Sequence, residues 1–158
     1  MRAHDIATTI RIVRRDQSVA EASQALADSG KTGLVVADEA GHPVGVITVL
    51  DVVRLALPEY LVDDPSLAAT LDEQSIHDVL APLRNKTLAE AIADKTVRLR
   101  DLPDVDADAT MLEIAAVLVG SGCAVAALAG TAPSEPRFVT LPAVLQAVLA
   151  DGSGVEPA

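Results

Sequence analysis

The sequence predicts an α/β protein built from two βαββα repeats that are related by an approximate two-fold axis. The main observation is that residues 13–57 align with residues 105–149, without a gap, at an offset of 92 positions. Each copy contains a capped helix, two apolar strands and a second helix. A unit of this size cannot bury its own apolar face, so the two copies are expected to pair around one core.

Composition and charge limit what the paired repeats can bind. The chain has 158 residues, half of them hydrophobic, which is enough for one domain that buries about 68–70% of its unfolded surface. Phe138 and Tyr60 are the only aromatic residues, and the formal net charge is −11. We therefore expect no nucleic-acid partner, because bases find almost no ring to stack on and the charge opposes a phosphate backbone. The first repeat repels an anionic ligand least, since residues 1–54 carry six basic and seven acidic residues, against six and sixteen in residues 55–158.

The elements of the first repeat follow from local signals. Ile10 and Ile12 alternate with polar residues and predict a strand, and Ser18 and Glu21 form a capping box for a helix that Gly30 ends. A hairpin and a last helix follow, at residues 34–37, 44–47 and 49–57.

The second repeat restates these signals, with Thr110 and Glu113 as the capping box and Gly122 as the helix stop. The segment between the repeats contains three prolines and six acidic residues, which predicts a linker with a short helix around residues 75–80, and Thr87 then caps another helix. The chain therefore divides into a first repeat, an acidic linker, a second repeat and a disordered tail, at residues 1–57, 58–86, 87–150 and 151–158.

Several classes of protein are not expected. The N-terminus lacks the basic and apolar regions of an export signal, and the single Cys123 cannot form an internal disulfide, so a cytoplasmic location is expected. Residues 114–134 carry no charge, but Ser121-Gly122 interrupts them, which indicates a buried helix and strand rather than a membrane span. The three histidines are scattered, and no acid–base pair, catalytic triad or phosphate loop occurs, so we expect neither a metal site nor an enzyme.

Thr48 and Asp51 form the candidate ligand site of the first repeat. If Val49 begins the last helix, Thr48 is its N-cap and Asp51 its third residue, beside free N–H groups and a dipole that attract anions. Thr48 can then donate to a phosphate oxygen, the Asp51 carboxylate can accept both hydroxyls of a ribose, and Gly45 would let a ligand lie close to the strand. The alternative is that Thr48 and Asp51 form only a capping box, which stabilises the helix by about 1 kcal/mol.

Residues 33–38, Gly41 and residues 44–53 together resemble the cystathionine-β-synthase (CBS) domain, which occurs in tandem as the Bateman module. The most specific part is the run Gly45-Val46-Ile47-Thr48-Val49-Leu50-Asp51. The resemblance is strong over residues 4–57 and weaker over residues 87–150. It implies clefts between the two domains that bind AMP, ADP, ATP or S-adenosylmethionine and so regulate enzymes or transporters. It favours ligand binding over capping alone, and Gly33 is a further candidate contact. Lys31, in a loop beside the strands, is a candidate contact for a phosphate, and its alternative role is that of a solvated surface charge.

The second repeat departs from this pattern. Thr140 keeps the helix cap, but Ala143 replaces Asp51 and Arg137 replaces Gly45. A ribose would meet no carboxylate there, so this site is expected to be empty or to hold a ligand by other contacts. One nucleotide per chain is therefore expected.

The resemblance implies a stand-alone CBS-pair regulatory module that binds an adenosine nucleotide and signals in trans to an effector enzyme or transporter. Helices 49–57 and 144–149 are apolar on more than one face, which indicates either a homodimer through these helices or cover by the acidic linker. The alternative function is a ligand-free scaffold for dimerisation or interaction. The sequence leaves open which adenosine compound binds.

Overall fold

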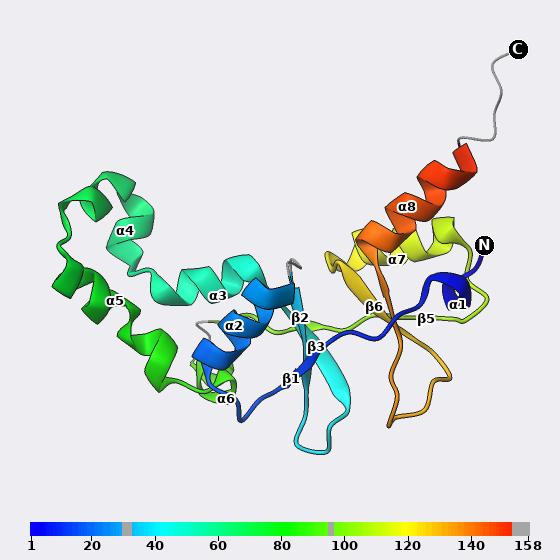
Figure 1. The fold of residues 1–158 in the computed structure, drawn as a ribbon, viewed down its shortest axis with the longest axis horizontal. Coiled ribbons are helices and arrows are strands. Elements are labelled where there is room, and N and C mark those ends of the chain that lie inside the picture. The colour runs from blue at the N-terminus through cyan, green and yellow to red at the C-terminus, as the bar shows by residue number, and fades with distance from the viewer. Residues whose placement is uncertain (30–32, 95–96, 153–158) are drawn as a thin grey trace, which may run out of the picture.

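Two small sheets with helices packed on them form the structure (Figure 1). It is a computed structural model and describes residues 1–29, 33–94 and 97–152. The first repeat consists of β1 (Ile12–Arg14), α2 (Val19–Ser29), β2 (Gly33–Ala37), β3 (Pro43–Thr48) and α3 (Val49–Ala56). The second consists of β5 (Asp104–Val105), α7 (Met111–Ser121), β6 (Val125–Leu128), β7 (Phe138–Thr140) and α8 (Leu141–Gly152). Both repeats have the predicted βαββα order.

The strands of the two repeats pair in the same way. β1 lies parallel to β2, which forms an antiparallel hairpin with β3, and β5 lies parallel to β6, which is antiparallel to β7. A further short strand, β4 (Arg100–Asp101), adds to the first sheet in an antiparallel register that sets Arg100 opposite Val46. The chain between the repeats therefore runs along the edge of the first sheet before it enters the second.

The helix starts follow the local signals of the sequence. Thr110 donates its backbone N–H to the Glu113 carboxylate at 2.7 Å, and the N–H of Glu113 donates to the Thr110 hydroxyl at 3.3 Å. Gly122 ends α7 with a φ of 67°, a left-handed conformation that glycine adopts without strain. The predicted stop at Gly30 lies outside the described residues.

The segment between the repeats is more helical than the sequence predicted. It contains α4 (Glu59–Asp63), the 3-10 helix η1 (Pro65–Thr70) and α5 (Glu73–Asn85). α5 extends beyond the short helix predicted around residues 75–80 because the Asp72 carboxylate accepts the N–H of Ser75 at 2.8 Å and so caps the helix at an earlier residue. It also packs against α2 and α3, which stabilises the longer helix.

The segment that precedes each repeat packs on the opposite repeat. α1 (Ala3–Ile6) lies beside α7 and β5 (Figure 1), where Ala3 donates its N–H to the carbonyl of Ala109 at 3.0 Å. α6 (Leu88–Ala93) lies beside α2, where Leu88 donates its N–H to the carbonyl of Gln17 at 2.9 Å. In space, each half of the molecule therefore contains a helix that the sequence order assigns to the other repeat.

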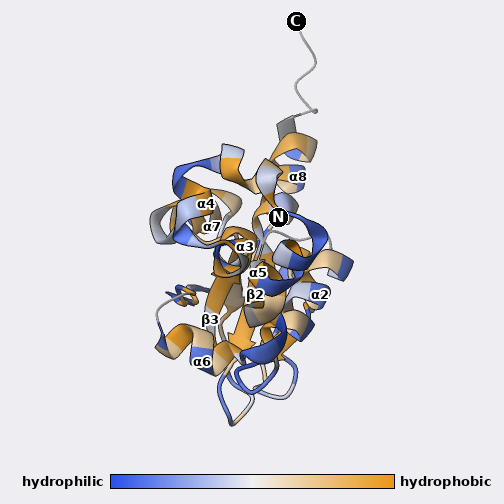
Figure 2. Ribbon diagram, turned by 90° about the vertical axis from the view of Figure 1, so that its left-hand side faces the viewer, coloured by the Kyte–Doolittle hydropathy of each residue, from blue (hydrophilic) through white to orange (hydrophobic). Residues whose placement is uncertain are grey.

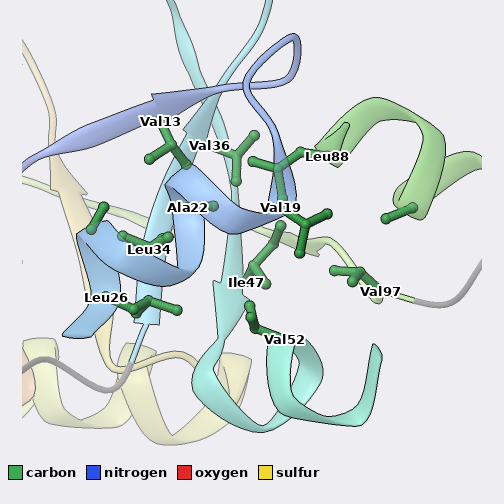
Figure 3. Close-up of a cluster of buried hydrophobic side chains, with 12 residues drawn as sticks. Val13, Val19, Ala22, Leu26, Leu34, Val36, Ile47, Val52, Leu88 and Val97 are labelled. Atoms are coloured by element: carbon green, nitrogen blue, oxygen red, sulfur yellow. The ribbon is translucent and has the colours of Figure 1, made fainter. Parts of the chain in front are cut away.

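Aliphatic side chains form the core, as the composition predicts. In the first half, Leu88 and Val97 pack among Val19, Ile47 and Val52 (Figure 3), so the exchanged segment completes this cluster. The strands β2 and β3 are hydrophobic over most of their length (Figure 2). A separate buried cluster joins the two sheets and contains Val35, Val46, Cys123, Val125 and Phe138. Each half thus has a cluster of its own and the two repeats share the central one, instead of the single core that the sequence predicted.

Candidate functional site

A cleft of about 600 Å³ lies between the two repeats. The first repeat contributes Gly33, Val46, Thr48, Val49 and Leu50 to its walls. The second repeat contributes Gly122, Ala124, Val125, Thr140 and Pro142. Ile10 and Arg100, from the segments that connect the halves, complete the lining. Most of these side chains are apolar, so the cleft can bury an apolar or aromatic group while a few polar groups orient it.

The two helices that end the repeats both begin at this cleft. Thr48 precedes α3 and Thr140 precedes α8, and the two threonines are equivalent in the internal repeat. Each helix therefore directs its N-terminal end, with its positive dipole, to the same space. The two ends differ in charge, because Asp51 lies in the first turn of α3 whereas the first turn of α8 contains no acidic residue.

Asp51 forms the capping box that the sequence offered as the alternative to ligand binding. Its Oδ2 accepts the Thr48 hydroxyl at 2.8 Å and the Thr48 N–H at 3.4 Å, while the Asp51 N–H donates to the Thr48 Oγ1 at 3.3 Å. Asp51 is 9% exposed and does not line the cleft. Within the part of the chain that the structure describes, no group donates to its Oδ1.

Gly45 has a different neighbour from the one expected. A Cβ at this position would lie 2.4 Å from Leu99 Cδ1, 2.6 Å from Leu99 Cγ and 2.9 Å from the carbonyl oxygen of Arg100. The space left by the missing side chain is therefore filled by Leu99, and Gly45 does not line the cleft. This packing does not fit the expectation that a ligand approaches the strand at Gly45.

The second repeat contains the equivalent pair with the sizes reversed. At the offset of 92 positions, Arg137 corresponds to Gly45 and Ala7 corresponds to Leu99. The guanidinium of Arg137 donates to the carbonyl of Ala7. A large residue thus faces a small one at both places, and Arg137 fixes the N-terminal segment instead of lying in the cleft.

The remaining predicted contacts are placed as follows. Gly33 lines the cleft, where an added Cβ would lie 3.1 Å from the carbonyl oxygen of Ile47. Lys31 lies outside the described residues. Of the predicted contact residues that the structure describes, only Thr48 and Gly33 line the cleft, and only Thr48 has a polar side chain.

Sequence reasoning missed Arg100. It enters the cleft from β4, and the offset of 92 positions relates it to Thr8, so no repeated motif marks it. Its Nε is buried and has no hydrogen-bond partner among the described residues. Only the pairing of β4 with β3 brings this residue to the cleft.

Residues 1–29, 33–94 and 97–152 lack two further features. No helix there combines the length and the hydropathy that a membrane crossing requires. No three His, Cys, Asp or Glu side chains of these residues lie together as metal ligands.

One family model matches the chain: the CBS domain, over residues 3–57. Among solved structures, a CBS domain-containing protein of unknown function from Kribbella flavida is 33% identical, with a TM-score of 0.74, over 94% of this chain and 99% of that chain. No curated protein matches the chain.

Two other solved structures share the fold at lower identity. CBSX2 from Arabidopsis thaliana, in complex with AMP, is 18% identical, with a TM-score of 0.62, over 96% of this chain and 98% of that chain. A CBS domain pair in complex with 5′-methylthioadenosine and S-adenosyl-L-methionine is 14% identical, with a TM-score of 0.60, over 96% of this chain and 98% of that chain.

Proposed function

The chain belongs to the CBS-domain family and is a tandem pair of these domains, and from this premise we propose that it binds an adenosine nucleotide and regulates a partner protein in trans. The observation that carries the proposal is the cleft between the repeats, at which both terminal helices begin. Its volume of about 600 Å³ is in the range of small-molecule sites, and its aliphatic walls can bury a planar base.

Asp51 is the proposed ribose contact. Its Oδ2 is engaged by Thr48, which holds the carboxylate in one orientation, and its Oδ1 accepts no bond from the described residues. A ribose hydroxyl that donates to Oδ1 would therefore not have to break the capping box. Capping and ligand binding become compatible roles of one side chain.

One nucleotide per chain is proposed. The two helix starts are equivalent by position, but Ala143 stands where the first repeat has Asp51. Only the helix start of the first repeat therefore has a carboxylate beside the cleft to offer to a ribose. The adenosine compounds in the two low-identity structures, AMP in one and 5′-methylthioadenosine with S-adenosylmethionine in the other, support the class of ligand.

Isothermal titration of the full chain with AMP, ADP, ATP and S-adenosylmethionine tests the proposal. We expect saturable heat with at least one of them, and the D51N variant should weaken it by about 1–3 kcal/mol because a charged acceptor is lost. The control is E113Q, which also removes a capping-box carboxylate, but at the start of α7, whereas the cleft touches this helix at its other end, at Gly122. It should leave the affinity unchanged. Equal losses of affinity in D51N and E113Q would mean that Asp51 acts only on stability.

A ligand-free scaffold is the second candidate function. It is favoured by the exposed apolar side chains on α3 and α8, which α5 does not cover. These are Leu50 (73% exposed), Val53 (48%), Leu145 (55%), Val148 (50%) and Leu149 (72%). We propose that these helices form a homodimer interface in either case, since faces of this kind mark interaction sites. Absence of heat with all four adenosine compounds at millimolar concentration would leave the scaffold as the function.

A further inference from the structure

The charge in the cleft is opposite to the charge of the chain. The chain contains 23 acidic and 12 basic residues, yet among the described residues that line the cleft Arg100 is the only charged one. An anion that enters this cleft therefore meets a cation and no lining carboxylate. Because the cleft is mainly apolar and Arg100 is half-buried, this charge is less screened than one on the open surface.

Arg100 is fixed at the backbone, and the Nε of its guanidinium has no hydrogen-bond partner among the described residues. Its backbone pairs with Val46 in the first sheet, while its Nη1 lies 3.2 Å from the position that a Cβ on Gly122 would occupy, so its side chain reaches the second repeat. Its Nε is buried without a partner, and none of the ion pairs of the described residues includes it. A buried N–H without an acceptor is costly, and a ligand oxygen would remove that cost.

The start of α8 also favours an anion on the side of the cleft that the second repeat forms. The N–H of Leu141 donates to the carbonyl of Ala124 at 2.8 Å, which joins the start of α8 to the segment that follows Gly122. The first turn of this helix contains no acidic residue, because Ala143 replaces the aspartate found in the first repeat. The positive end of the α8 dipole is therefore not neutralised, and it favours an anion beside Arg100.

We infer that Arg100 makes this cleft selective for a phosphorylated adenosine compound, by binding the phosphate on the side of the second repeat while the ribose faces Asp51. The inference rests on the proposed function, since the base and the ribose give the ligand its place in the cleft. It explains why the two repeats differ: a carboxylate suits the ribose end, and its absence suits the phosphate end. S-adenosylmethionine, whose sulfonium is cationic, should bind less well than AMP.

Arg100 also has a structural interpretation that the test must separate. Its guanidinium lies at the C-terminal end of α7, where free carbonyls and the negative end of the helix dipole attract a cation. Loss of this contact alone would weaken every ligand to the same degree. Loss of a phosphate contact would weaken AMP and leave adenosine nearly unchanged.

The experiment measures the affinities of AMP, adenosine and S-adenosylmethionine by titration calorimetry, for the wild type and for the variants R100Q, R100K and R98Q. Arg98 is exposed and close in sequence, so R98Q removes the same charge without entering the cleft. We expect the wild type to bind AMP about 10- to 100-fold more tightly than adenosine, as a charge-assisted contact provides. R100Q should remove most of this preference, R100K should keep part of it and R98Q should keep all of it.

Two results would overturn the role of Arg100 while leaving the proposed function intact. One is equal affinity of the wild type for AMP and adenosine, and the other is an equal loss of affinity for AMP and for adenosine in R100Q. If the wild type binds none of the three compounds, and neither ADP nor ATP, the proposed function fails and this inference fails with it. Thermal unfolding shows whether each variant is folded. If R100Q is not folded, the preference of the wild type and its reduction in R100K decide the matter.

Discussion

The contact between Gly45 and Leu99 predicts a specific coupling between two positions far apart in the chain. In G45A, the new methyl group would lie 2.4 Å from Leu99 Cδ1, 2.6 Å from Leu99 Cγ and 2.9 Å from the carbonyl oxygen of Arg100. These distances are well inside van der Waals contact, so Leu99 and β4 must move. Overpacking of this kind costs about 1–3 kcal/mol in the free energy of unfolding.

The second variant of the pair separates the side-chain clash from the backbone clash. L99A removes the two closest atoms, Cγ and Cδ1, and leaves only the carbonyl oxygen of Arg100 near the new methyl group. L99A alone should also destabilise the protein, because a half-buried leucine is lost. The double variant G45A/L99A should therefore be more stable than the sum of the two losses, by roughly 1 kcal/mol or more.

Urea unfolding followed by circular dichroism measures these differences, and a loss of 1 kcal/mol lowers the melting temperature by about 2–4 °C in a protein of this size. The control is G120A, where an added Cβ has no neighbour within 4 Å. G120A should be neutral or stabilise the helix by about 0.5–1 kcal/mol. If the losses in G45A and L99A simply add in the double variant, Leu99 is not the reason for glycine at position 45.

Two further predictions concern assembly and pH. V53E should dissociate the proposed homodimer while the monomer stays folded, because Val53 is 48% exposed on α3. Analytical ultracentrifugation at micromolar concentration measures the dissociation, with V62E on α4 as the control variant. A wild type that sediments as a monomer would contradict the dimer. The backbone and hydroxyl hydrogen bonds from Thr110, with the charge of Arg2, hold the pKa of Glu113 below its ordinary value of 4.5. A carboxylate whose pKa is lower in the folded than in the unfolded protein stabilises the fold at any pH above its unfolded-state pKa. This stabilisation is lost as the pH falls through the folded-state pKa, so E113Q should lose more stability at about pH 7 than at about pH 3.5. Urea midpoints that differ equally at both pH values would refute this role.

The sequence alone determined the repeated units and their local features. Capping boxes and the left-handed stop at Gly122 depend on residues three or four positions apart, so their geometry is set by local sequence. The same holds for Thr48 and Asp51, whose hydrogen bonds are those that the T-x-x-D spacing predicts. The loss of the acid at Ala143 was also visible, because the internal offset aligns it with Asp51.

The tertiary structure decided which segments meet. The exchange of α1 and α6 between the halves, the packing of Leu99 on Gly45 and the entry of Arg100 into the cleft all join residues from different repeats. Such contacts depend on the path of the chain between the repeats, and the register of β4 on β3 is fixed by pairing rather than by any signal in its two residues. Sequence patterns therefore located Asp51 at the start of α3, whereas only the folded chain brought Arg100 to the cleft.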